Sequence, residues 1–433
     1  MRNARLWQRV LGLVRTVVEG VEFDEDADAV VVSVRPCKGG RRRCGRCGRR
    51  APWYDRGEGS RRWRGLDLGT VRVLLEAEAP RVNCPTHGPT VVQVPWARHG
   101  AGHTYAFDDT VAWLAVQCSK TAVTELMRIA WRTVGSIITR VQVDVDATVD
   151  RLAGLRRIGI DEISYKRGYK FLTVVVDHDS GHLVWAKPGR DDATLHSFFD
   201  ALGEDRCAQI THISADAADW IERVVKARCA NAVRCADPFH VVAWATDALD
   251  EVRRQAWNDA RAQARSEPRR PRGRPRADTP HQLGHRERAR AITHARYALW
   301  KNPENLTESQ HDKLAWIAKT DPRLHRAYLL KEGLRTVFVF KGDAGKEALD
   351  RWICWARRCR IPAFVKLQRR IVKHRAAIDA ALDHGLSNAL IESTNTKIRL
   401  LTRVAFGFHG PEPLIALAML ALGGHKPNLP HRQ

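Results

Sequence analysis

Acidic residues and long hydrophobic runs are scarce in this sequence. Its 433 residues include 49 Asp and Glu against 72 Lys and Arg, which gives a formal net charge of +23. No apolar run approaches the ~20 residues that cross a bilayer, so we expect no membrane partner. Residues 1–18 lack a small-residue cleavage site of the secretory kind, and we expect a cytoplasmic protein. The charge excess attracts polyanions and favours nucleic acid as the partner.

The cysteines are spread too unevenly for a disulfide framework. Cys44 and Cys47 form one pair, and Cys84 and His87 form a second pair with the same spacing. Such a pair lets two ligands leave one tight turn toward one ion, and two pairs complete the tetrahedron of sulfur and nitrogen donors that Zn²⁺ prefers. Residues 1–100 are therefore predicted to form a zinc-ribbon domain with one structural Zn²⁺.

Basic residues accompany this domain and the helical segment that follows it. Arginines surround the first cysteine pair, and DNA contacts are expected from Arg41, Arg42, Arg43 and Arg46. Cys37 is a spare thiol that could replace one zinc ligand.

Residues 101–150 have the periodicity of three short helices, the content of a helix-turn-helix domain. Its last helix, from residue 131, buries Val and Ile and leaves Arg132 and Arg140 outside, as a recognition helix does, although a small helical connector would look similar.

Residues 151–240 alternate between strands and helices. Runs rich in Val, Ile and Leu predict strands at 155–163, 171–177, 182–187, 209–215 and 232–235. This order, with a late helix, is the layout of a ribonuclease H-like core. Residues 241–386 are predicted to be an all-α insertion with a basic linker at 265–290 and a continuous helix across 364–382. Residues 387–433 are predicted to supply the C-terminal helices of the core. The predicted fold is thus α/β and multidomain.

Three acids fall where a two-metal site would need them. Asp161 lies inside the first strand, Asp216 ends the fourth, and Glu392 shares a face of the late helix with Asn395 and with Arg399, a candidate DNA contact. An acid inside an apolar strand is costly to bury without a cation. Two-metal chemistry needs one bridging carboxylate and at least one more on each side. The sequence therefore predicts that Asp161, Asp216 and Glu392 bind two Mg²⁺ or Mn²⁺ ions.

Asp237 also ends a strand and is the alternative to Asp216. The chain resembles the DDE transposases of bacterial insertion sequences of the ISL-three type over nearly its whole length. Beyond the cysteine pairs, the resemblance rests on residues 63–67, 158–162, 237–241, 249–254 and 387–395. It implies metal-dependent cleavage and transfer of DNA strands by the triad Asp161, Asp216 and Glu392. It also implies flanking site roles for Asp237, His240 and Asn395.

The resemblance further implies double-stranded DNA as the partner, both as terminal inverted repeats and as target, bound by a homo-oligomer at the bacterial nucleoid. Two residues depart from the family pattern. His87 stands where a cysteine is common, which zinc tolerates, and His409 stands where an arginine is more often expected. Two other functions remain open: a DNA-binding regulator without catalysis, and a nuclease that cuts without joining.

The basic linker contains a short arginine motif. Pro271-Arg272-Gly273-Arg274-Pro275 resembles a hook that inserts into the narrow minor groove of A·T-rich DNA. Arg272 and Arg274 are therefore candidate DNA contacts. A solvated linker without a DNA contact is the alternative.

Overall fold

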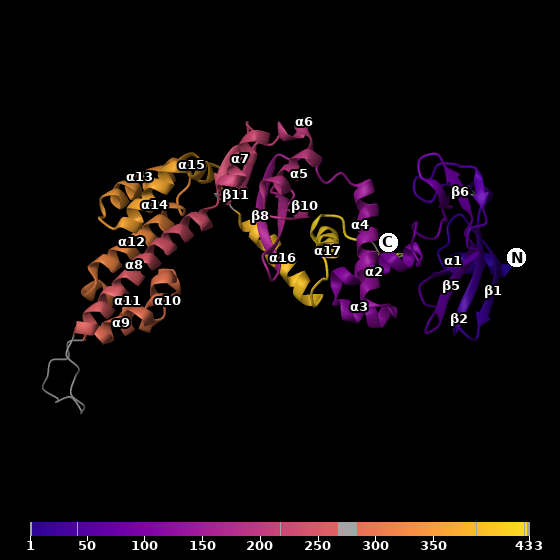
Figure 1. Ribbon diagram of the computed structural model, residues 1–433, viewed down its shortest axis with the longest axis horizontal. Coiled ribbons are helices and arrows are strands. Elements are labelled where there is room, and N and C mark those ends of the chain that lie inside the picture. The colour runs from indigo at the N-terminus through magenta and orange to yellow at the C-terminus, as the bar shows by residue number, and fades with distance from the viewer. Residues whose placement is uncertain are drawn as a thin grey trace, which may run out of the picture. The chain divides into compact units, whose positions relative to one another are not determined.

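Figure 1 shows the computed structural model, whose chain divides into two compact units. Unit 1 comprises Met1–Arg151 and Thr396–Gln433, and unit 2 comprises Leu152–Asn395. The structure describes residues 2–40, 42–216, 218–266, 284–386, 388–427 and 429–430. The predicted contacts Arg41, Arg272 and Arg274 lie outside these residues. Within them, no helix is both long enough and apolar enough to cross a membrane.

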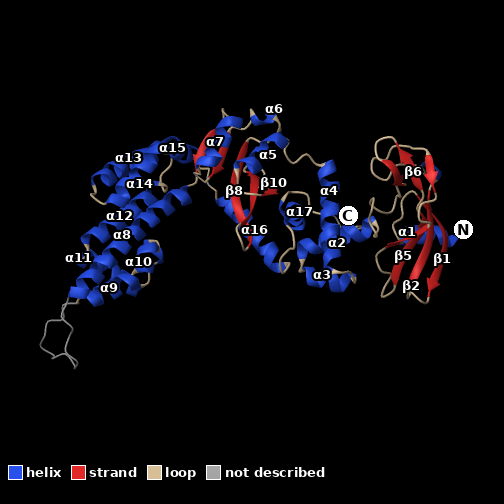
Figure 2. Cartoon of the chain, viewed as in Figure 1, coloured by secondary structure: helices blue, strands red, loops and turns tan. Residues whose placement is uncertain are grey.

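The N-terminal part of unit 1 holds two small sheets, drawn as red arrows in Figure 2. The larger sheet has the order β1-β2-β5-β4, with bounds Thr16–Asp24, Ala29–Pro36, Arg72–Glu78 and Ser60–Arg64. The smaller has the order β3-β6-β7, with bounds Trp53–Asp55, Arg81–Cys84 and Gly88–Val91. A short 3-10 turn, η1 (Lys38–Gly40), separates β2 from the zinc-ribbon region, and α1 (Arg2–Val10) packs on β1. Alternating Val and Leu side chains of the neighbouring strands β2 and β5 line one face of this sheet and form its core.

Helices make up the rest of unit 1. They are α2 (Tyr105–Gln117), α3 (Lys120–Met127), α4 (Trp131–Thr148) and α17 (Pro411–Leu422). The side chains of Thr104 and Ser119 accept N–H bonds at the starts of α2 and α3 and so fix where these helices begin. The sequence grouped residues 387–433 with the core, but contacts group 396–433 with unit 1. The reason is α17, whose alanine- and leucine-rich faces pack on α2 and α4.

Unit 2 contains a five-stranded mixed sheet of order β10-β9-β8-β11-β12. The strands span Arg157–Lys166 (β8), Lys170–Asp177 (β9), Leu183–Pro188 (β10), His212–Ala215 (β11) and Val233–Ala236 (β12). β8, β9 and β10 are antiparallel neighbours, whereas β11 and β12 run parallel to β8. This is the ribonuclease H-like order that the sequence predicted. Helices α5 (Asp192–Leu202), α6 (Glu204–Cys207) and α7 (Asp219–Arg228) connect the strands, and α5 and α7 pack on the face that holds Ile158 and Ile160.

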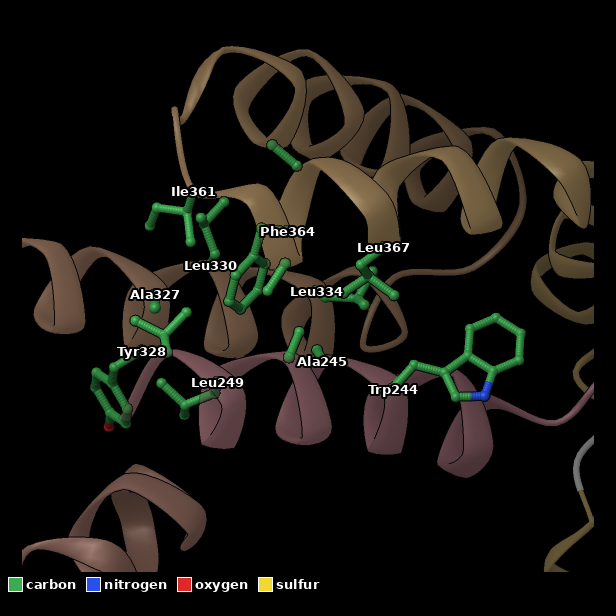
Figure 3. Close-up of a cluster of buried hydrophobic side chains, with 14 of the residues drawn as sticks. Trp244, Ala245, Leu249, Ala327, Tyr328, Leu330, Leu334, Ile361, Phe364 and Leu367 are labelled. Atoms are coloured by element: carbon green, nitrogen blue, oxygen red, sulfur yellow. The ribbon is translucent and has the colours of Figure 1, made fainter. Parts of the chain in front are cut away.

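After β12 the chain of unit 2 is helical. The helices are α8 (Pro238–Ser266), α9 (His285–His294), α10 (Arg296–Trp300), α11 (Glu308–Thr320), α12 (Pro322–Val337), α13 (Gly342–Arg358), α14 (Pro362–Lys373), α15 (Arg375–His384) and the start of α16 (Ala389–Val404), with the short turn η2 (Pro303–Asn305) after α10. Figure 3 shows side chains of α8, α12 and α14, such as Leu249, Leu330 and Phe364, pointing toward one another. The predicted all-α insertion is thus a bundle with its own apolar core.

Candidate active site and metal centre

Four side chains of the small sheet of unit 1 form one compact donor group. The ligand atoms of Cys44, Cys47, Cys84 and His87 all lie within 4.8 Å of one another. The Sγ atoms of Cys47 and Cys84 are 3.7 Å apart, and His87 Nδ1 lies 3.6 Å from the Sγ atoms of both Cys44 and Cys84. A tetrahedron with Zn–S bonds of ~2.3 Å has S···S edges of about 3.8 Å. The donors and their spacing therefore suit Zn²⁺, as the sequence predicted.

Local backbone geometry fixes this group in place. Cys84 ends β6 and His87 lies in the turn to β7, while the Arg46 N–H donates to Cys44 Sγ at 3.4 Å. A Cβ on Gly45 would lie 2.6 Å from the carbonyl oxygen of Val91, so only glycine fits at position 45, directly after the first ligand. Burial raises the pKa of the Cys84 thiol, but hydrogen bonds from nearby backbone N–H groups and from His87 outweigh it and lower the pKa to about 6. Cys84 is thus readily available as a thiolate ligand.

The arginines predicted to contact DNA in unit 1 divide into two groups. Those on the surface are Arg42, Arg46, Arg132 and Arg399. Two others are engaged within the chain. Arg43 donates to the Gly48 carbonyl oxygen at 2.9 Å, and Arg140 donates to both carboxylate oxygens of buried Asp108 at 3.0 and 3.1 Å. Arg140 therefore stabilises the packing of α4 against α2. The helical pattern placed Arg140 on the outer face and did not predict this ion pair.

In unit 2, strand register brings acids from distant parts of the chain to one edge of the sheet. In the parallel pair of β11 and β8, Ala215 lies opposite Ile160, so Asp216 and Asp161 follow at the same level. β12 extends this register by one strand, and Asp237 follows it there. Asp216 and Asp237 directly follow β11 and β12, and Asp161 lies at the same level inside the longer strand β8, so the three aspartates lie side by side.

Asp161 of β8 contacts the late helix α16. Asn395 of α16 donates from Nδ2 to Asp161 Oδ2 at 2.8 Å, and the Glu162 N–H donates to Oδ1 at 2.8 Å. Burial raises the pKa of the Asp161 carboxyl, and the charges of Asp216 and Glu392 raise it further. Asp216 and Glu392 are therefore both close enough to Asp161 to disfavour its charged form.

Asp237 is used differently from its neighbour Asp216. Its side chain is 2% exposed; Oδ2 pairs with His240 Nδ1 at 2.8 Å, and Oδ1 accepts from the Asn388 N–H at 3.2 Å. The bond to Asp237, aided by Asp216 at 3.9 Å, raises the pKa of His240 to about 9. Asp216 is more open, with 32% of its side chain exposed. Asp237 thus joins β12 to the start of α16, and Asp216 is better placed to take a ligand.

Sequence reasoning did not single out Glu162. Its side chain is 9% exposed, and its Oε1 is buried without a hydrogen-bond partner in the described chain. Burial raises its pKa to about 7 despite Arg190, whose Nε lies 3.5 Å from Oε2, and Asp161 and Asp216 add to the rise. The sequence feature that could have identified Glu162 is its position directly after Asp161 in a strand. Consecutive side chains of a strand point to opposite faces, so Glu162 lies on the other face of β8.

Comparisons with known proteins agree with this architecture. The zinc-finger of transposase IS204/IS1001/IS1096/IS1165 matches residues 40–87, and the helix-turn-helix domain of transposase family ISL3 matches residues 92–142. The transposase domain of the same family matches residues 158–418, more than half of the chain. The chain belongs to the ISL3 transposase family. As a DDE transposase it is an enzyme that cleaves and transfers DNA strands, as the sequence predicted.

Relatives of this transposase are similar over their whole length. Transposases for insertion sequence element IS1557 from two strains of Mycobacterium tuberculosis are 71% identical over 438 residues, which cover 100% of this chain and 98% of each relative. The transposase for insertion sequence element IS1001 from Bordetella parapertussis is 23% identical over 415 residues, which cover 95% of this chain and 96% of the relative.

Proposed function

We propose that the transposase binds the terminal inverted repeats of its element and that Asp161, Asp216 and Glu392 perform the strand cleavage and transfer with two Mg²⁺ or Mn²⁺ ions. The observation that supports this most is the strand register, which sets Asp161 and Asp216 side by side at one sheet edge. The pKa of Asp161, raised by burial and then by its acidic neighbours, indicates negative charge that a cation would relieve.

The residues at this edge fit hard divalent cations. The donors are carboxylate oxygens, which Mg²⁺ and Mn²⁺ prefer, with no thiol among the predicted ligands. Bound there, two such ions would activate the attacking oxygen and stabilise the leaving 3′ oxygen. The chain itself holds the ligands: Asn395 orients the Asp161 carboxylate, and Asp237 fixes His240 and the backbone of Asn388 just before α16. Glu392 is then presented from a helix whose start is anchored.

DNA recognition is proposed for unit 1. Zinc held by Cys44, Cys47, Cys84 and His87 would keep the Arg46 loop rigid, so that its charge meets phosphates. On α4, Arg132 is exposed and stands at the N-terminal end, where recognition helices contact base edges. We also propose a homo-oligomer on DNA, because an element has two ends; light scattering of the DNA complex tests it.

A strand-transfer assay tests the proposed function. The zinc-loaded transposase is incubated with labelled duplexes of the element ends, an unlabelled target duplex and Mg²⁺. Cleaved ends together with end-to-target products support the proposal. Cleaved ends without joined products would indicate a nuclease, and binding without cleavage would indicate a DNA-binding regulator.

A further inference from the structure

Lys120 is a buried lysine of unit 1 to which the proposed catalysis gives no role. It begins α3, and 1% of it is exposed. Its Nζ lies 3.3 Å from the centre of the Trp131 ring and 4.9 Å from that of Phe408. Among the described residues its ammonium has no hydrogen-bond acceptor and no carboxylate partner. Aromatic faces attract a cation, but they do not neutralise its charge.

The other fully buried lysine is compensated. Lys331 of unit 2 is 2% exposed, and its ammonium forms an ion pair with Glu332 and donates to the Lys301 carbonyl oxygen at 3.4 Å. Burying a charge is costly unless it is paired. Lys331 follows this rule within its own chain, whereas Lys120 does not. The ammonium of Lys120 is therefore available to an anion from outside the chain.

A cavity of about 1050 Å³ gives such an anion access to Lys120. Its lining carries five cationic side chains other than histidine, but Arg98 and Arg140 are bonded to acids of α2 and α4. Arg46 and Arg132 have no ion pair among the described residues. Of the two lining acids, Asp144 is already bonded to Arg98, which leaves Glu412. Lys120 and the two free arginines thus face one uncommitted carboxylate, and the cavity retains positive charge.

The cavity lies along the face of α4 that carries Arg132 and Ser136. These are the residues that a recognition helix would present to a DNA groove, so an anion in the cavity would belong to the backbone of the same DNA. Burial lowers the pKa of the Lys120 ammonium to about 8. The side chain is nevertheless mostly protonated at neutral pH and can pair with a phosphate.

We propose that Lys120, held between Trp131 and Phe408, is a phosphate-binding residue that receives one phosphodiester group of the DNA gripped by α4. The inference rests on the proposed binding of DNA by unit 1. It adds a contact that exposed basic residues do not provide, because this lysine is buried at a fixed position. A fixed charge sets where the DNA backbone lies relative to α4 and so acts as a register point.

The test measures binding of the full zinc-loaded chain to a fluorescein-labelled duplex of mixed sequence by anisotropy, between about 50 and 200 mM salt. Lys120→Met preserves the length and apolar contacts of the side chain, so the fold should be retained; circular dichroism and zinc content check this. The variant should bind roughly tenfold more weakly, and the slope of log affinity against log salt should fall by about 0.9, the value of one phosphate contact. Lys120→Arg should keep the slope because it keeps the charge.

The matched control is Lys319→Met, which removes one exposed lysine of α11 in unit 2 and should leave the slope unchanged. A folded Lys120→Met protein with wild-type affinity and slope would overturn the inference and reduce Lys120 to a packing residue. If inorganic phosphate protected the wild type but not Lys120→Met from thermal unfolding while both kept the same duplex slope, the site would bind free anions and the DNA assignment would be wrong. A wild type that binds no duplex would overturn the proposed function as well.

Discussion

Asp161 in unit 2 and Lys120 in unit 1 carry opposite charges, but burial disfavours the charged form of both side chains. It raises the pKa of Asp161 and lowers that of Lys120, so that each group is pushed toward its neutral form. The two surroundings differ. Asp161 accepts hydrogen bonds from Asn395 and from the Glu162 backbone and has further carboxylates nearby, whereas Lys120 touches aromatic faces. One region gathers several carboxylates around His240, and the other holds one ammonium against two aromatic rings.

This difference indicates two ways of preparing a site for a ligand. A cluster of acids on one sheet edge is prepared for small, highly charged cations, which have to be contacted from several sides. A single ammonium in an open cavity is prepared for one group of a long polymer, which brings its remaining charges elsewhere along its length. A change to one of these two regions should therefore leave the other region unchanged.

Removing zinc should give the largest effect and should be confined to unit 1. Cys44→Ser takes one ligand from the group, and structural zinc sites in small domains contribute about 10 kcal/mol or more to folding. Elemental analysis should show the loss of one Zn²⁺ per chain, and calorimetry should show an early transition for the ribbon. His87→Cys, which keeps four donors, should retain the metal. Unchanged zinc content in folded Cys44→Ser protein would refute the assignment.

The triad should give the next largest effect, on the side of Asp161. Asp161→Asn, Asp216→Asn and Glu392→Gln should each lower the rate of end cleavage by at least about 10³-fold, because an amide does not hold two cations as a carboxylate does. Duplex affinity should stay within about twofold, since no phosphate contact is removed. Asp237→Asn is the informative comparison: if it alone abolished cleavage while Asp216→Asn cleaved normally, the second position would belong to Asp237.

The stability cost of Lys120 should depend on pH. Its pKa is about 8 in the folded chain and near 10.4 when unfolded, so between these values the unfolded state binds more protons. The wild type should therefore gain about 2 kcal/mol in unfolding free energy relative to Lys120→Met as pH rises from about 8 to 10.5. Below about pH 7 the difference between the two proteins should be constant, because Lys120 is then protonated in both the folded and the unfolded state. Urea unfolding across this range measures it, and a flat difference throughout would mean that burial does not perturb the lysine.

The smallest expected effect concerns the support of Asp161. Asn395→Ala removes the amide that donates to Asp161 Oδ2, and loss of such an outer contact typically weakens metal binding by about tenfold. The Mg²⁺ concentration for half-maximal cleavage should rise by that factor, with the rate at saturating Mg²⁺ largely restored. Thr394→Ala, the adjacent residue on α16, is the control and should leave the Mg²⁺ dependence unchanged. A rate that Mg²⁺ cannot restore would give Asn395 a role beyond positioning.

The elements that the sequence predicted best are those specified by local pattern. β8 to β12, α2 to α4 and the cysteine pairs follow from hydrophobic period and ligand spacing, and the structure and the family matches confirm them. Features that depend on pairing between distant segments were not predictable. The bond of Arg140 to Asp108, the packing of α17 on α2 and α4 and the burial of Lys120 under Phe408 each join residues that no local pattern connects.

A smaller difference lies in the helical insertion. Continuous periodicity predicted one helix across residues 364–382, but the structure has α14 and α15 with His374 between them. His374 is 8% exposed and its ring lies 5.7 Å from that of Trp244, so a tertiary contact coincides with the break. Glu162 illustrates the same limit in the site, because its burial follows from the sheet and not from its neighbours in sequence.

The bond between Asp237 and Asn388 closes a long excursion of the chain. These residues are 151 positions apart, yet the Asp237 carboxylate accepts the Asn388 N–H at 3.2 Å. The first and last residues of the helical bundle therefore lie next to each other beside the sheet. A domain whose two ends meet in this way can be shortened, extended or exchanged at its far end without shifting the scaffold that carries it. The bundle is thus an insertion in the ribonuclease H-like core. A change in the length of the bundle would leave Glu392, four residues after Asn388, near Asp161.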